Sequence, residues 1–157
     1  IEIKNNRVIN EEIVADIVVQ SSNLKGCTVE AEMAKFMIDE YPILSIASSF
    51  AEGPSCFKGL GELKVKESDR LELIRLNLDK CGVYCKINNE DIFIDPSKKT
   101  QVKDLNIRTD FDHRIAMSFA IMGSLLSNDL KISDSESINT SFPNFIECYN
   151  KAGGNLC

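Results

Sequence analysis

The segment 64–82 reads KVKESDRLELIRLNLDKCG and decides how the middle of this chain folds. Its apolar residues Leu71, Ile74 and Leu78 recur at spacings of three and four, which places them on one face of a helix. Gly82 follows the last of these turns, and glycine commonly ends helices because it adopts the left-handed conformation without steric penalty. The segment therefore predicts an amphipathic helix that begins directly after a run of ionisable residues.

Strands and helices alternate on both sides of this helix. Strands are predicted at 14–20, 55–60, 83–88, 91–95 and 130–133, and further helices from Pro42 to the Gly53-Pro54 pair, from Asp112 to Leu126 and from near Ser141 to Gly153. The helix from Asp112 is apolar nearly all round, which predicts deep burial. In the last helix Phe145, Ile146 and Tyr149 are expected to face inward. Two rounds of strand, helix, strand, helix, strand, at 14–95 and 105–157, indicate an internally repeated α/β unit whose second round is incomplete.

Composition restricts the classes of function. The 157 residues are 43% hydrophobic and 27% charged with a net charge of −6, as in one ordinary globular domain with neither a nucleic-acid nor a membrane partner. No apolar run reaches the roughly 20 residues that span a bilayer, and residues 1–4 lack the features of a secretion signal, so a cytoplasmic location is expected.

The metal-binding residue types are also unfavourably arranged. The six cysteines include no Cys-x-x-Cys pair, and the only histidine, His113, is distant from all of them in sequence. We expect no metal and no cofactor, and we expect the cysteines to serve as small apolar residues rather than as nucleophiles.

Ionisable residues gather where three of the predicted helices begin. These junctions are Asp39-Glu40, the run from Lys64 to Arg70, and Asp112-His113-Arg114. If they converge, their arginines and helix N-termini are suited to a phosphorylated, carboxylated ligand. The simpler alternatives are helix caps formed by Asp69 and Asp112, solvated ion pairs around Lys66, and a His113 that only packs or supports its neighbours.

The same residues resemble sequence motifs of one enzyme family, 5-enolpyruvylshikimate-3-phosphate (EPSP) synthase. Residues 64–71 resemble its Arg-Val-Lys-Glu-Ser/Thr-Asp-Arg-Leu signature, with Lys64 in place of the arginine, and 112–117 resemble its Asp-His-Arg motif. Residues 37–42, 50–53 and 140–143 follow in family order, and Ile-Asp-Glu-Tyr-Pro is similar to the branch known for low glyphosate sensitivity. The resemblance implies an α/β fold, an inside-out α/β barrel-like prism built of βαβαββ units.

The resemblance also implies a reaction and a role for each site residue. The family transfers the enolpyruvyl group of phosphoenolpyruvate to the 5-hydroxyl of shikimate 3-phosphate, without a cofactor. By position, Asp39 binds shikimate 3-phosphate and accepts its proton, Lys66 contacts the same substrate, and Glu67 transfers protons. Arg70 and Arg114 bind phosphoenolpyruvate, with His113 and Lys64 in supporting positions.

The family's N-terminal motifs, a Lys-Ser pair, Gly-Asn-x-Gly-Thr and Ser-Ala/Gly-Gln, do not occur in this sequence. Residues 1–157 are therefore expected to form the C-terminal part of the enzyme, about two repeat units, with the N-terminal domain as its missing partner and no turnover alone. Two alternatives stay open at this point. One is a transferase acting on UDP-N-acetylglucosamine, and the other is a non-catalytic remnant or interaction domain.

Overall fold

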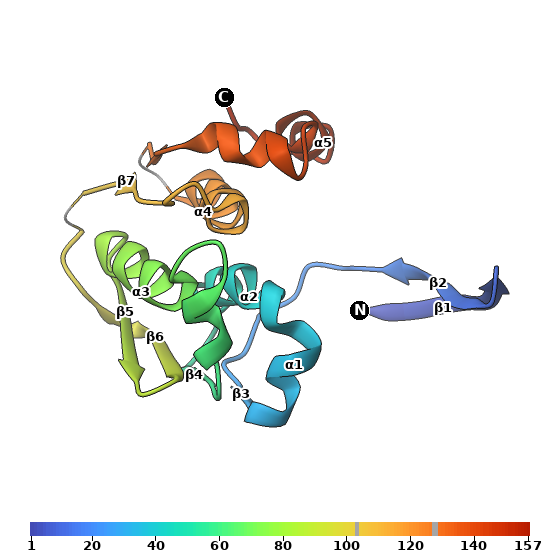
Figure 1. Ribbon diagram of the computed structural model, residues 1–157, viewed down its shortest axis with the longest axis horizontal. Helices are drawn as coiled ribbons and strands as arrows, with labels where there is room; N and C mark the ends of the chain where they lie inside the picture. Colours follow the sequence, from blue (N-terminus) through green and yellow to red (C-terminus); the bar gives the residue numbers. More distant parts are fainter. Residues whose placement is uncertain (103, 127–128) are drawn as a thin grey trace.

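The computed structural model describes residues 1–102, 104–126 and 129–157. Strands, α-helices and 3-10 helices (η) alternate along these residues, and a two-stranded hairpin projects from one side of the body (Figure 1). In chain order the elements are β1 (Glu2–Ile9), β2 (Glu12–Val18), β3 (Thr28–Val29), η1 (Ala31–Met33), α1 (Ala34–Met37), η2 (Ile38–Glu40), α2 (Tyr41–Ser49), β4 (Ser55–Phe57), η3 (Gly61–Val65), α3 (Arg70–Lys80), β5 (Val83–Asn88), β6 (Asp91–Lys99), β7 (Asn106–Ile107), α4 (His113–Leu125), β8 (Lys131–Ile132), η4 (Ser135–Thr140) and α5 (Phe145–Lys151).

A four-stranded sheet in the order β3-β4-β6-β5 lies at one side of the body, with α2 and α3 packed against it (Figure 1). β3 and β4 are parallel, while β6 runs antiparallel to both of its neighbours. The predicted hairpin of 83–88 and 91–95 is confirmed, although β6 continues to Lys99. From β3 to β6 the elements follow in the order β, α, β, α, β, β, which is the repeat unit that the sequence resemblance implied.

The helix predicted from segment 64–82 forms as α3 and supplies much of the core. Its residues Leu71, Ile74 and Leu78 are fully buried, as their spacing predicts. Tyr41 and Ile46 on α2 are buried against the same cluster, and Pro42 occupies the first turn of that helix, where a missing N–H leaves no bond unmade. These contacts hold the N-terminal ends of α2 and α3 in a defined position.

The N-terminal hairpin corrects one prediction. The strand expected at 14–20 as the start of the first repeat is β2 (Glu12–Val18), and it pairs with β1 instead of joining the four-stranded sheet. The first round therefore starts at β3. Because β1 and β2 pair only with each other among the described residues, this two-stranded sheet has little stability of its own.

The two faces of the hairpin differ in polarity. Ile3 lies opposite Ile17 and Val8 opposite Ile13 on one face, and all four side chains are at least 67% exposed. The other face carries polar pairs such as Arg7 with Asp16. An apolar face of this kind is usually covered by another part of a protein or by a partner.

The C-terminal part contains β7, α4, β8 and α5, with α4 between α2 and the last helix (Figure 1). The strand predicted at 130–133 is β8, which extends only over Lys131–Ile132 and pairs in parallel with β7. Burial of α4 is less complete than predicted, because Leu125 is 57% exposed. The inward face expected for the last helix is likewise wrong at Ile146, which is 44% exposed, whereas Phe145 is buried. Among the described residues, no helix is both long and apolar enough to cross a bilayer.

Candidate active site

The three junctions that the sequence singled out converge on one guanidinium group, that of Arg70. This side chain is 1% exposed and is the first residue of α3. Its terminal nitrogens donate to Asp39 at 2.9 Å and to Glu67, and its Nε donates to Asp112 at 2.7 Å. Asp39 lies in η2 and Asp112 at the start of α4, so residues 31 and 42 positions away from Arg70 meet at its side chain.

Local structure explains why these side chains reach the same place. Asp39 lies in the 3-10 turn directly before α2, whose position is set by the buried Tyr41. Lys66 and Glu67 lie between η3 and α3, and Asp69 caps α3 by accepting a hydrogen bond from the N–H of Glu72 at 3.0 Å. The starts of α2, α3 and α4 thereby face one another.

Asp112 has a larger part in this arrangement than a helix cap. Its side chain is completely buried, and one oxygen accepts from the N–H groups of Arg114 and Ile115 at 2.9 and 3.3 Å. The other oxygen accepts from Arg70 and from the hydroxyl of Ser68, the latter at 2.9 Å. The sequence indicated the cap but not the bonds to Arg70 and Ser68, because no local pattern reports contacts 42 and 44 residues apart.

The other two cations of the cluster also have carboxylate partners. Arg114 donates to the backbone oxygen of Asp39 at 3.0 Å and lies 3.3 Å from a carboxylate oxygen of Glu40. Lys66 pairs with Glu62 and lies 3.8 Å from Asp39. The hydrogen bond with Glu62 raises the pKa of Lys66, so the ammonium group remains charged at neutral pH.

Charge within this cluster has a direct consequence for ligand binding. Three cationic groups, on Lys66, Arg70 and Arg114, face five carboxylates, those of Asp39, Glu40, Glu62, Glu67 and Asp112. The formal excess is negative. A phosphorylated ligand must therefore displace carboxylates from the arginines or bring further cations with the rest of its site, since like charges at this distance repel.

Two residues expected in supporting positions differ from the rest. Lys64 donates to the backbone oxygen of Asn89 at 3.1 Å, and among the described residues it forms neither a hydrogen bond nor an ion pair with the Arg70 cluster. His113 is half-buried as the first residue of α4, next to both Asp112 and Arg114, and hydrogen-bonds to no described residue. Neither geometry assigns these residues a direct chemical task.

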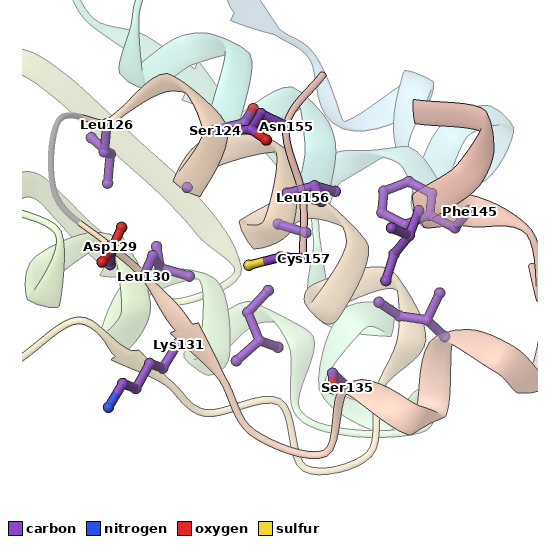
Figure 2. A pocket seen from close by; sticks show the side chains of 15 residues that line it. Ser124, Leu126, Asp129, Leu130, Lys131, Ser135, Phe145, Asn155, Leu156 and Cys157 are labelled. Atoms are coloured by element: carbon purple, nitrogen blue, oxygen red, sulfur yellow. The ribbon is translucent and has the colours of Figure 1, made fainter. Parts of the chain in front are cut away.

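A cavity of about 700 Å³ lies elsewhere, between α4, β8 and the C-terminal residues (Figure 2). Its lining is mostly apolar, with Leu130, Phe145 and Leu156 among the side chains that surround it. Lys131 is the one cationic side chain among the described lining residues. The cavity therefore lacks the cations that an anionic substrate requires, and cavity size alone does not locate the chemistry. In the described part of the chain, no three His, Cys, Asp or Glu side chains are grouped to hold a metal ion.

Comparison with known proteins gives the family of this chain. Residues 2–148 match the family model described as EPSP synthase (3-phosphoshikimate 1-carboxyvinyltransferase). The chain belongs to the EPSP synthase family. The 3-phosphoshikimate 1-carboxyvinyltransferase of Paramagnetospirillum magneticum is 48% identical over 145 residues, and that of Rhizobium johnstonii is 43% identical over 161 residues. The family named from the sequence motifs is thus confirmed.

Solved structures of EPSP synthase support the same fold. An EPSP synthase structure from Acinetobacter baumannii superposes with a TM-score of 0.87 at 36% identity and covers 96% of this chain. The inside-out α/β fold expected from the resemblance is confirmed by this match. This chain covers 35% of that structure, and 32% and 35% of the Paramagnetospirillum and Rhizobium relatives. The chain therefore spans about a third of the length of its EPSP synthase relatives.

Proposed function

We propose that this chain is the C-terminal part of a cytosolic 3-phosphoshikimate 1-carboxyvinyltransferase and forms one side of its active site. The observation that carries the proposal is the convergence of Asp39, Lys66, Glu67, Arg70 and Arg114 from three separate segments. Each of the five occupies a position in a family motif to which the resemblance attaches a role. Unrelated surface charges have no reason to meet in this way.

The proposed reaction has two steps that move protons in opposite directions. In the addition step the 5-hydroxyl oxygen of shikimate 3-phosphate bonds to C2 of phosphoenolpyruvate, Asp39 takes the hydroxyl proton, and a proton is added to the methylene carbon. In the elimination step the C2–O bond to phosphate breaks and the new methyl group loses a proton. Glu67 is the proposed proton donor and acceptor at that carbon. Both carboxylates are partly exposed at the cluster, so substrate can reach them.

The cations have the complementary task of holding the substrates' negative groups. Arg70 and Arg114 are the proposed partners of phosphoenolpyruvate, since a guanidinium binds carboxylate or phosphate through two parallel hydrogen bonds. Lys66 is the proposed partner of shikimate 3-phosphate. Arg70 has five N–H donors and uses one for each of its three carboxylate partners, so donors remain for a ligand.

We further propose that the chain needs the remaining part of the enzyme for turnover. The cluster has an excess of carboxylates, which opposes binding of two anionic substrates until cations from elsewhere contribute. The exposed apolar face formed by Ile3, Val8, Ile13 and Ile17 is consistent with a missing neighbour that covers it. Closure of two domains over the substrates also excludes water from the reacting groups.

Release of inorganic phosphate from phosphoenolpyruvate plus shikimate 3-phosphate tests this proposal. The chain alone is compared with the chain mixed with a separately expressed N-terminal domain of the enzyme. We expect release only in the mixture, and we expect Glu67→Gln and Arg114→Ala to abolish it. Glu72→Gln is the matched control, because Glu72 lies on the same helix start but pairs with Arg75 outside the cluster.

Two other outcomes contradict the proposal. If the mixture releases no phosphate although both parts are shown to be folded, the result favours a non-catalytic remnant. Release that requires UDP-N-acetylglucosamine in place of shikimate 3-phosphate assigns the chain to the other enolpyruvyl transfer reaction.

A further inference from the structure

The carboxylate of Asp112 bonds to both proposed phosphoenolpyruvate-binding arginines, to the side chain of Arg70 and to the backbone N–H of Arg114. Its Oδ2 accepts from Nε of Arg70 at 2.7 Å, and its Oδ1 accepts from the backbone N–H of Arg114 at 2.9 Å. The side chain is completely buried. A buried carboxylate thus links the start of α3 to the start of α4, beside the more exposed Asp39, which also contacts both arginines.

The bond to Nε determines how the Arg70 guanidinium is oriented. A guanidinium is planar and rigid, so a hydrogen bond that fixes Nε also fixes the directions of the two terminal nitrogens. Those nitrogens contact Asp39 and Glu67, the two proposed catalytic carboxylates. Asp112 thus directs the free donors of Arg70 toward the reacting groups while remaining away from them itself.

Ser68 supports this arrangement from the other side. Its hydroxyl donates to the same Oδ2 at 2.9 Å that accepts from Arg70. Ser68 lies one residue before the cap of α3, so its bond joins the entry of α3 directly to the entry of α4. With the hydroxyl absent, the oxygen loses one of two donors and the carboxylate is held less firmly in a buried site.

We propose that Asp112, held by Ser68, is a positioning residue that sets the orientation of Arg70 relative to Arg114 for phosphoenolpyruvate. The inference rests on the proposed function and adds two residues to its site. The rival explanation is that Asp112 only caps α4. Asp69 separates the two explanations, since it caps α3 through the N–H of Glu72 and, in the described part of the chain, does not bond to the guanidinium of Arg70.

The kinetic test uses the full-length enzyme that carries this segment. In Ser68→Ala we expect KM for phosphoenolpyruvate to rise about three- to tenfold, with KM for shikimate 3-phosphate unchanged, whereas Ser68→Thr keeps the hydroxyl and keeps both values. Asp112→Asn keeps a cap acceptor but loses the charged partner of Nε, and a rise of about ten- to hundredfold is expected. Asp69→Ala lowers Tm without a selective change in KM.

A second measurement does not depend on turnover. In the same enzyme labelled with 15N-arginine, the Nε–H of Arg70 is expected to exchange slowly with water, and to exchange faster in Ser68→Ala but not in Ser68→Thr. Equal exchange in the two variants overturns the inference, as does a KM effect shared equally by both substrates or by Asp69→Ala. If the unsubstituted enzyme releases no phosphate, the proposed function fails, and the exchange result alone still decides the link between Ser68, Asp112 and Arg70.

Discussion

Replacing Arg70 with methionine perturbs the buried centre of the site and has an effect that the structure allows us to estimate. The pair of Arg70 with Asp112 has both side chains at most 1% exposed, whereas Asp39 and Glu67 are 40% and 53% exposed. Breaking a buried pair by removing one partner costs about 3–5 kcal/mol, and each exposed pair adds about 0–1 kcal/mol. We therefore expect Arg70→Met to lower the free energy of unfolding by about 3–5 kcal/mol, almost all of it from the stranded carboxylate of Asp112.

Urea unfolding followed by circular dichroism measures this loss, with two controls. Arg75→Met is the matched variant on the same helix, and it removes a half-exposed pair with Glu72 at a cost of about 0.5 kcal/mol. The double variant Arg70→Met with Asp112→Asn carries no stranded charge and is expected to be about 2 kcal/mol more stable than Arg70→Met alone. A loss no greater than that of Arg75→Met, or no recovery in the double variant, refutes the reasoning.

Three further predictions concern parts of the chain away from the site. Ile13→Lys with Ile17→Lys on the exposed face of the hairpin is expected to reduce self-association of the isolated chain in light scattering, while Tm changes little. Burial raises the pKa of Cys81 to about 11 and of Cys85 to about 12, above the ordinary 9.0. The thiols of the unfolded chain therefore lose their protons at lower pH than those of the folded chain, and Tm is expected to fall as the pH rises from 9 toward 11. The variant with alanine at both positions is expected to show a shallower fall in Tm. Gly82 has a φ of +80°, and an added Cβ lies 2.9 Å from a methyl carbon of Val102, so Gly82→Ala is expected to destabilise the chain by about 1–2 kcal/mol in the same urea assay.

Much of the secondary structure could be predicted from the sequence because its signals are local. The spacing of Leu71, Ile74 and Leu78 identified α3, and the two short strands predicted at 83–88 and 91–95 correspond to β5 and β6. The 3-10 helices were missed, since short turns of this kind have no periodic pattern to detect. The strand at 14–20 was detected but placed in the wrong sheet, because strand propensity does not state which strand will be the neighbour.

For the candidate site, the sequence motifs contain Asp39, Lys66, Glu67, Arg70 and Arg114, which the structure brings into one cluster, but the motifs do not show how these side chains pair. Asp112 was predicted to cap α4, which is correct, and its bond to Arg70 was not foreseen. Lys64 matches a motif position and nevertheless binds the backbone at Asn89 outside the cluster. A motif thus carries residue types and their order, whereas side-chain direction depends on the turn in which each residue lies.

By itself, the sequence determined the family, the four longer α-helices and most strands of the body, and it nominated the residues of the candidate site. These follow from patterns within about twenty residues, where hydrophobic spacing, caps and motifs act. Only the tertiary structure decided that Asp39 and Asp112 form one ion-pair network with the buried Arg70, that carboxylates outnumber cations there, and that the N-terminal hairpin exposes an apolar face. The physical reason is that ion pairs and burial depend on how elements distant in sequence pack against one another, and packing is a property of the whole folded chain.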